Sequence, residues 1–295
     1  MEGATWSILY GDGSSSSGEV YTDTVTIGGV TFASQAVEVA TRVSAQFTND
    51  PNSNGLVGLG FSNINTVQPQ RQNTFFENII PTLDSPIFTA DLRTQETGTY
   101  NFGWIDYDAF LGNITYTDVD TSLGSGLWGM NIQGYSITAS GASDALIADN
   151  FTAATVTGVA DTGSTLLLLP RALVMDYYSY IQGAAYDHDH AGWCFPCDGE
   201  VPDFSFGISG TDPEDNLIIT IPASYLSYGR IYTGTDQKWR CYGSIQYDEH
   251  VGFPIFGDVA LKSAFVVFDH AGGGIDYSQP RIGWAKKILF ISPFQ

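Results

Sequence analysis

Short alternating runs of apolar and polar residues dominate the chain and predict a mainly β protein. Residues 19–27 (EVYTDTVTI) alternate, and Gly28, Gly29 and a second β-type stretch at 30–32 follow, which is typical of a β-hairpin. The chain contains 33 Gly and 12 Pro, residues that often end secondary-structure elements, so short strands are favoured. Further strands are expected at residues 97–104, 114–119, 127–137, 217–221 and 264–269.

Two stretches have the apolar spacing of helices, at residues 74–80 and 171–181. The second begins after Pro170, a residue that suits a helix N-terminus. No Pro- or Ser-rich linker divides the chain, and we place a lobe boundary inside the stretch 124–140. The expected lobes are residues 1–128 and 129–295.

A weak internal repeat supports two related lobes. Residues 55–58 (GLVG) resemble residues 254–257 (PIFG), since both place two apolar residues before a glycine in an apolar context. Related lobes predict that functional features of the second half have partners in the first.

Composition and charge exclude several classes of protein. Hydrophobic residues make up 43% of the 295 residues, enough for a sizeable core and too many for a disordered chain. With 11 Lys and Arg against 32 Asp and Glu, the net charge is −21, so neither a nucleic-acid nor an anionic-membrane partner is expected. Charged residues are only 15%, and a surface rich in Ser, Thr and Gly is typical of a secreted protein working in acid.

Targeting and membrane segments are not expected within this chain. The first residues lack the basic and apolar regions of a signal peptide, and no run of about 18 apolar residues occurs. The apolar stretch 286–295 is expected either to form a covering strand or to be sequence read beyond a missed splice site. The composition therefore indicates an exported protein, although the start of the chain does not.

Metal and cofactor sites are not expected either. Cys194 and Cys197 form a C-x-x-C and Cys241 stands apart, which falls short of a four-ligand zinc site and fits one disulfide with a spare thiol. His188 and His190 lie in an acidic stretch that we interpret as a solvated loop.

The sharpest chemical motif is Asp161-Thr162-Gly163-Ser164, which lies between two apolar runs. A carboxylate flanked by Val and Leu is partly desolvated and needs hydrogen bonds, which Thr162, Ser164 and backbone N–H groups can supply. The alternative is an ordinary turn. A second candidate is the sequence Tyr-Gly-Asp-Gly-Ser at residues 10–14, a hairpin-turn signal that can equally be a plain β-turn.

Together these motifs resemble the pepsin-like aspartic proteinases, and in particular their fungal secreted branch. The resemblance runs from about Trp6 to about Trp284, with its motifs in the family's order and at about its spacing. It implies a bilobal pepsin-like fold in which a hairpin flap covers an inter-lobe cleft that binds a peptide or protein substrate. The motifs that carry it are residues 6–14, 54–60 (NGLVGLG), 64–70 (INTVQPQ), 161–164 (DTGS), 255–259 (IFGDV) and 261–269 (LKSAFVVFD).

The resemblance assigns roles residue by residue. Asp161 matches the catalytic Asp of the C-terminal lobe, supported by Thr162, Gly163 and Ser164, of which Thr162 braces the active-site loops and Ser164 hydrogen-bonds the Asp. Gly58 and Gly257 match the glycines that close two crossing loops.

Three further assignments follow from the same resemblance. Tyr10 matches the flap tyrosine that closes over substrate, and Gly11, Asp12 and Ser14 match other flap positions. Cys197 and Cys241 match a disulfide of the C-terminal lobe, which leaves Cys194 unmatched. Asp258 matches a structural position.

One departure from the family pattern bears on activity. The family mechanism needs two carboxyls that share a proton, and this sequence has one Asp-Thr-Gly. Asp161 precedes Gly257 by 96 residues, and the same interval counted back from Gly58 falls upstream of Met1. We therefore expect an incomplete N-terminal lobe that lacks the first Asp-Thr-Gly and exposes strand edges able to self-associate.

Several hypotheses about activity remain open, so whether this chain is an enzyme is left undecided. The first is an acid endopeptidase lineage in which Asp161 is present without its partner, so that this chain alone is inactive or impaired. The second is a peptide-binding pseudoprotease. The third is a repurposed enzyme in which Asp161, with Tyr10, performs acid–base chemistry on a small molecule. A fourth is complementation by another chain that supplies the missing Asp.

Overall fold

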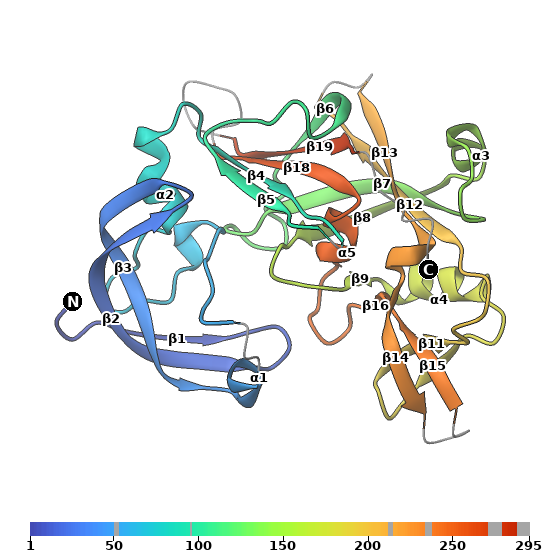
Figure 1. Ribbon diagram of the computed structural model, residues 1–295, viewed down its shortest axis with the longest axis horizontal. Helices are drawn as coiled ribbons and strands as arrows, with labels where there is room; N and C mark the ends of the chain where they lie inside the picture. Colours follow the sequence, from blue (N-terminus) through green and yellow to red (C-terminus); the bar gives the residue numbers. More distant parts are fainter. Residues whose placement is uncertain (50–52, 95, 212–214, 234–237, 271–278, 288–295) are drawn as a thin grey trace. The chain divides into compact units, whose positions relative to one another are not determined.

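The computed structural model describes residues 1–49, 53–94, 96–211, 215–233, 238–270 and 279–287. Its strands form four sheets, and its helices are short, as expected for a mainly β chain (Figure 1). The stretch 286–295, for which a covering strand was one expectation, lies outside the described residues from 288 onward.

A three-stranded antiparallel sheet, in the order β1-β2-β3, comes first in the chain. Its strands are β1 (Thr5–Leu9), β2 (Ser15–Ile27) and β3 (Val30–Val43). The hairpin predicted around Gly28 and Gly29 is confirmed: both glycines have positive φ values, of 58° and 81°, which side chains rarely tolerate. β3 extends eleven residues beyond the predicted 30–32, because its pairing with β2 continues to Val43.

The other three sheets contain five, seven and four strands, in the orders β5-β4-β18-β19-β6, β13-β12-β7-β8-β17-β9-β16 and β10-β11-β15-β14. The five-stranded sheet contains β4 (Ile87–Asp91), β5 (Thr99–Phe102), β6 (Leu111–Asp118), β18 (Ala264–Asp269) and β19 (Arg281–Lys286). The seven-stranded sheet contains β7 (Gly129–Thr138), β8 (Thr152–Ala160), β9 (Leu167–Leu169), β12 (Asp203–Ser209), β13 (Asn216–Ile221), β16 (Ile245–Tyr247) and β17 (Ile255–Phe256). The four-stranded sheet contains β10 (Ala185–Asp187), β11 (Gly192–Phe195), β14 (Ser227–Thr233) and β15 (Lys238–Gly243).

Both predicted helices are confirmed with shorter bounds. α2 (Phe75–Ile79) is capped by Thr74, whose side chain accepts a hydrogen bond from the Glu77 backbone N–H. α4 (Arg171–Ser179) follows Pro170. The remaining helices are α1 (Ala45–Thr48), α3 (Asp144–Asp149), α5 (Asp258–Leu261) and the 3₁₀ turns Ser62–Ile64, Ile80–Thr82 and Ala223–Tyr225.

The chain divides into two compact units. The first unit comprises Met1–Ile87, Asn101–Trp104 and Thr121–Leu127, and the second comprises Phe88–Tyr100, Ile105–Asp120 and Trp128–Gln295.

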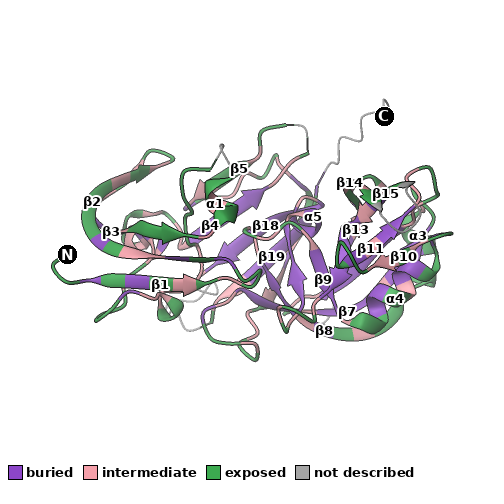
Figure 2. Ribbon diagram, turned by 90° about the horizontal axis from the view of Figure 1, so that it is seen from below, coloured by how far each residue is buried: buried purple, intermediate pink, exposed green. Residues whose placement is uncertain are grey.

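The first sheet of the chain and the strand β18 differ in how far their residues are buried. In the first unit, a small core cluster joins Ala4, Trp6, Val20 and Val67, while β2 and β3 are largely exposed. In the second unit, every residue of β18 is buried (Figure 2). Buried side chains in that unit also form ring contacts, such as Phe88 with Phe268 at 4.5 Å between centroids.

A buried ion pair joins β4 to the residue after β19. The Lys287 ammonium lies 3.0 Å from an Asp91 carboxylate oxygen, both side chains are 4% exposed, and the Lys287 ammonium also donates to the Leu92 carbonyl. Arg93 binds the other carboxylate oxygen of Asp91 at 2.7 Å. Burial lowers the pKa of Lys287, while the Asp91 carboxylate opposes that shift.

Candidate active site

Asp161 lies at the end of a buried strand, where the backbone is held by neighbours distant in sequence. β8 pairs in parallel with β17, and the Asp161 N–H donates to the Phe256 carbonyl over 3.1 Å. After the turn, the chain continues into β9, which pairs antiparallel with β17. β17 therefore contacts the strands on both sides of the Asp161 turn and fixes its position.

The Asp161 carboxylate accepts hydrogen bonds on both of its oxygens. Its Oδ1 accepts from the Gly163 N–H over 2.9 Å, and its Oδ2 accepts from the Ser164 hydroxyl over 2.6 Å. Asp161 is only partly buried, so one side of the carboxylate remains open to solvent. The hydrogen bonds expected from Ser164 and the backbone are thus present.

Gly257 allows a second backbone segment to approach this turn closely. A Cβ added to Gly257 would lie 2.4 Å from the Leu166 carbonyl oxygen and 2.7 Å from that of Ser164. The following residue, Asp258, donates its N–H to the Ser164 carbonyl over 2.7 Å. Only a glycine fits this contact, which holds the backbone at Gly257 against the Asp161 turn.

Tyr100, a residue on β5 that sequence reasoning missed, lies near Thr162 and within the electrostatic influence of Asp161 and Asp258. Burial raises the pKa of Tyr100, and the negative charges of Asp258 and Asp161 raise it further, while the neighbouring Thr162 side chain opposes the shift. Tyr100 and Thr162 are 62 positions apart, and no local pattern around Tyr100 indicates the contact.

Asp258 begins α5 and forms an ion pair with Lys262, one helical turn later, at 2.8 Å. Its Oδ1 is buried and has no hydrogen-bond partner among the residues that the structure describes. Asp258 is thus held by its own helix, in keeping with a structural position.

The hairpin turn between β1 and β2 holds the flap candidates together in the first unit. The Tyr10 N–H donates to the Ser14 carbonyl over 2.8 Å, and Gly13 has a φ of 81°. Asp12 accepts from the Ser14 N–H over 2.9 Å and from the Ser14 hydroxyl over 2.6 Å, and these bonds lower its pKa. Gly11 lies at the exposed tip of the turn.

The Tyr10 ring packs against the ring of Phe47, with 5.4 Å between ring centroids. Burial raises the pKa of Tyr10, and the carboxylates of Glu38 and Asp12 add to the shift. Tyr10 therefore stays a neutral phenol at any physiological pH, able to donate one hydrogen bond.

Gly58 differs from Gly257 in its surroundings. A Cβ added to Gly58 would meet no described heavy atom within 4 Å, so the close crossing contact that the resemblance implies at Gly58 is not formed. The adjacent Leu56 and Val57 are 65% and 56% exposed.

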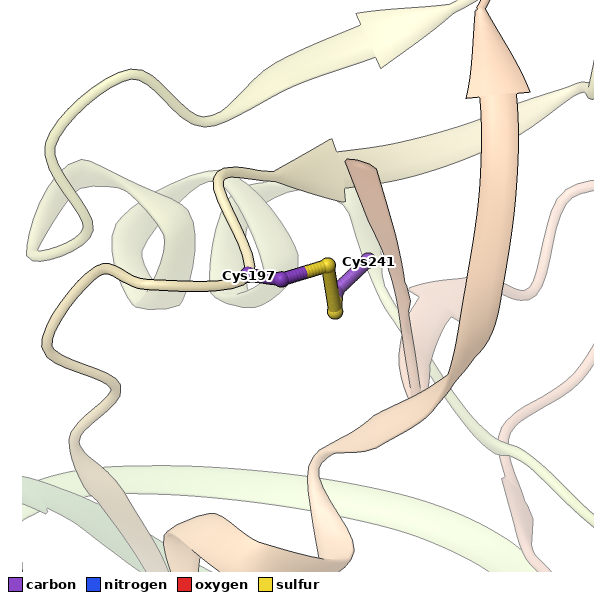
Figure 3. Close-up of a disulfide and its surroundings, with 2 residues drawn as sticks. All are labelled: Cys197 and Cys241. Carbon is purple, nitrogen blue, oxygen red and sulfur yellow. A yellow bond between two sulfur atoms is a disulfide. The ribbon is translucent and has the colours of Figure 1, made fainter. Parts of the chain in front are cut away.

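The disulfide that the resemblance implies is formed between Cys197 and Cys241, with 5.0 Å between their Cα atoms (Figure 3). Cys194 is a buried free thiol, and burial raises its pKa to about 11, with the Asp187 carboxylate adding to the shift. In the β11–β15 pairing, Cys194 lies opposite Tyr242 and Phe195 lies opposite Cys241. Since side chains alternate along a strand, Cys194 and the disulfide lie on opposite faces of this sheet.

No group of three or more metal-ligating side chains occurs in the described ranges. His190 instead contacts Asp187, whose carboxylate also accepts from the Asp189 and His190 N–H groups. None of the described helices is both long and apolar enough to cross a membrane.

Comparison with known proteins gives a consistent family. Endothiapepsin of Cryphonectria parasitica is 47% identical over 287 residues, which cover 97% of this chain and 62% of that protein. Aspergillopepsin-1 of Aspergillus oryzae is 46% identical over 287 residues, covering 97% of this chain and 66% of that protein. This chain thus spans somewhat less than two thirds of the length of these relatives.

A solved structure, that of the aspartic proteinase from Irpex lacteus, has the same fold. It superposes with a TM-score of 0.72 at 21% identity and covers 98% of this chain and 83% of that one. The family model described as "Eukaryotic aspartyl protease" matches residues 1–280. The chain therefore belongs to the pepsin-like eukaryotic aspartyl protease family.

Proposed function

We propose that this chain comes from an acid aspartic endopeptidase and that Asp161 supplies one of its two catalytic carboxyls. The observation that carries the proposal is the Asp161 carboxylate, which is held on both oxygens, by Gly163 and Ser164, yet remains partly exposed. An anchored, solvent-accessible carboxylate can take a proton from a water that attacks a peptide carbonyl.

The second carboxyl of this mechanism has no candidate motif in these 295 residues. Two nearby carboxyls share one proton, the ionised one activating water and the protonated one donating to the carbonyl oxygen. Since a single Asp-Thr-Gly occurs in the sequence, we propose that this chain alone is inactive or impaired. The open space beside Gly58 supports an N-terminal lobe that is incomplete.

We propose that residues 1–128 and 129–295 correspond to the two lobes, with Tyr10, Gly11, Asp12 and Ser14 as the flap. The flap turn is stabilised by the hydrogen bonds between Asp12 and Ser14. The neutral phenol of Tyr10 can donate a hydrogen bond to a peptide carbonyl. Thr162 acts as a brace of the Asp161 turn, and its proximity to Tyr100 on β5 supports that role. The partner is a peptide or protein substrate.

An extracellular location is part of the same proposal. The Cys197–Cys241 disulfide supports it, because such bonds persist in oxidising compartments. A strongly acidic chain with few Lys and Arg also suits an acidic medium, where many carboxylates lose their charge.

The exposed Leu56 and Val57 support self-association of the first unit. Sedimentation velocity of the wild type and of Leu56→Glu at several concentrations tests this. Oligomers that Leu56→Glu disperses are expected; a wild type that stays monomeric at every concentration contradicts it.

A peptide-cleavage assay in acid tests the main proposal. The 295-residue chain and its Asp161→Asn variant are incubated with a denatured protein substrate between pH 3 and 7, and new N-termini are counted. We expect little or no cleavage by either protein. Robust wild-type cleavage that Asp161→Asn abolishes would show that the chain is active and overturn the claim of impairment. Cleavage that Asp161→Asn leaves unchanged would remove Asp161 from the mechanism.

A non-catalytic peptide-binding role is the second candidate, favoured by the same single Asp-Thr-Gly. It predicts that a peptide binds the chain with measurable affinity in the absence of cleavage. Isothermal titration with an eight-residue apolar peptide, checked by mass spectrometry for integrity, distinguishes the two outcomes. Absence of both binding and cleavage would direct attention to small-molecule substrates.

A further inference from the structure

The strand β14 (Ser227–Thr233) lies at the edge of its sheet. In the order β10-β11-β15-β14, it pairs with β15 on one side, and no described strand pairs with its other side. The two strands lie side by side in Figure 1. A free strand edge presents unpaired N–H and C=O groups, which can pair with an extended segment of another chain.

One face of the β14–β15 hairpin gathers aromatic and cationic side chains. Tyr232 pairs with Trp239, and Arg230 pairs with Cys241, so these four side chains lie on the same face. Tyr232 is 48% and Trp239 65% exposed, and their rings meet edge to face at 5.5 Å between centroids. Cys241 is buried and linked to Cys197, which anchors this face to the loop after β11.

Arg230 is exposed and forms no ion pair or side-chain hydrogen bond with any described residue. Residues 227–243 contain three of the eleven Lys and Arg of the chain but only one of its 32 Asp and Glu. In a chain with a net charge of −21, this hairpin is therefore a local cationic exception.

We propose that the β14 edge binds an extended, acidic segment of a protein partner as an added strand. The main chain of the segment pairs with β14, a carboxylate pairs with Arg230, and an aromatic residue two positions away packs on Tyr232 and Trp239. Charge-assisted pairing selects acidic segments, and ring contacts add affinity. The proposal concerns binding alone and does not depend on peptide-bond cleavage.

A second copy of this chain is a less suitable occupant. Arg230 is the central residue of Ser227–Thr233, so symmetric antiparallel pairing of two copies would place Arg230 opposite its own counterpart. Like charges directly opposite each other destabilise a strand pair, so Arg230 disfavours such pairing.

Fluorescence anisotropy of a labelled heptapeptide, Thr-Val-Thr-Glu-Thr-Phe-Thr, tests the proposal at pH 7 and low salt. We expect saturable binding to the wild-type chain, weakened at least tenfold by Arg230→Glu and severalfold by Trp239→Ala. The matched control is Arg42→Glu, which makes the same charge change at an exposed arginine of β3 and should leave the affinity within twofold. Mass spectrometry checks that the peptide stays intact.

Two modified peptides test the mode of binding. Replacing Glu by Lys, or N-methylating alternate backbone amides, should each abolish binding. The proposal is overturned if the wild type does not bind, if Arg42→Glu weakens binding as much as Arg230→Glu, or if either modified peptide binds as well as the original. Sedimentation equilibrium tests whether a second copy of the chain binds the β14 edge instead. A wild-type dimer whose dissociation constant changes in Arg230→Glu would assign the edge to a second copy and overturn the proposal.

Discussion

The hydroxyl of Ser164 donates a hydrogen bond of 2.6 Å to the Asp161 carboxylate. This bond and the one from the Gly163 N–H hold the carboxylate within its own turn. Replacing Ser164 by Ala should lower the free energy of unfolding by about 1–2 kcal/mol, because a hydrogen bond to a charged group is lost. Urea denaturation at pH 6 measures the change. Ser164→Thr keeps the hydroxyl and should stay close to wild type, as should Thr165→Ala next to it; equal losses in all three would contradict this account.

The close contact at Gly257 predicts a strong effect of one methyl group. Gly257→Ala would place a Cβ 2.4 Å from the Leu166 carbonyl oxygen, so the strands around the Asp161 turn must shift. We expect a loss of about 2–4 kcal/mol in the free energy of unfolding. Gly58→Ala, where the added Cβ meets open space, is the matched control and should cost little. Comparable thermal midpoints for the two variants would show that the crossing at Gly257 is looser than described.

Asp12 and Ser14 predict a pH dependence in the flap turn. The two hydrogen bonds from Ser14 lower the pKa of Asp12 in the folded state. A lowered carboxyl pKa contributes stability that is present above the unfolded pKa and is lost as the pH falls through the folded pKa. The stability advantage of wild type over Ser14→Ala should therefore be greatest near pH 6 and shrink in strong acid.

The Asp12 carboxyl can be followed directly by carbon-13 NMR. Its titration midpoint should move upward in Ser14→Ala and stay unchanged in Ser17→Ala. A midpoint that Ser14→Ala leaves in place would remove Ser14 as the cause.

Cys194 predicts a thiol that is silent in the folded protein. With its pKa raised to about 11, only about one molecule in a thousand carries a thiolate at pH 8, and burial blocks access to it. A thiol reagent such as Ellman's reagent should therefore react slowly with the native chain and rapidly, with one thiol per chain, in denaturant. Prompt reaction of the native protein would mean that the sheet opens readily around β11.

The buried pair of Asp91 and Lys287 predicts an asymmetric response to mutation. Asp91→Asn leaves the Lys287 ammonium buried without a counter-charge and should cost about 3–5 kcal/mol in the free energy of unfolding. Lys287→Met removes the cation, while Asp91 keeps its ion pair with Arg93, so its cost should be much smaller. Chemical denaturation of both variants at pH 7 checks the order; a larger loss for Lys287→Met would reverse the argument.

Local features of the site could be predicted from the sequence, and long-range ones could not. The bonds of Asp161 with Gly163 and Ser164, and those of Asp12 with Ser14, join residues at most three positions apart. The contact of Tyr100 with Thr162 depends on how β5 is placed, which no periodic pattern encodes. The same holds for β9 and β17, which are too short to give a periodic signal, although they fix the Asp161 turn.

The fold class followed from strand periodicity and glycine punctuation, whereas the extent of the strands did not. β3 continues to Val43 as a mostly exposed strand whose weak apolar alternation does not identify it as a strand. The Cys197–Cys241 pairing came from family resemblance, since three cysteines allow three pairings and the sequence alone does not choose among them.

The small core cluster that includes Trp6 of β1 and Val20 of β2 has a consequence for the opening of the backbone. Four buried residues (Ala4, Trp6, Val20 and Val67) support the sheet that carries the Tyr10 turn, whereas β18 in the second unit is buried along its whole length. Amide hydrogens of β1 and β2 should exchange with solvent through local openings, at free energies well below those of β18. We therefore expect the turn that carries Tyr10 to open at a lower free energy than the turn of Asp161, which lies between β8 and β9 and beside β17, since every residue of β9 and β17 is buried.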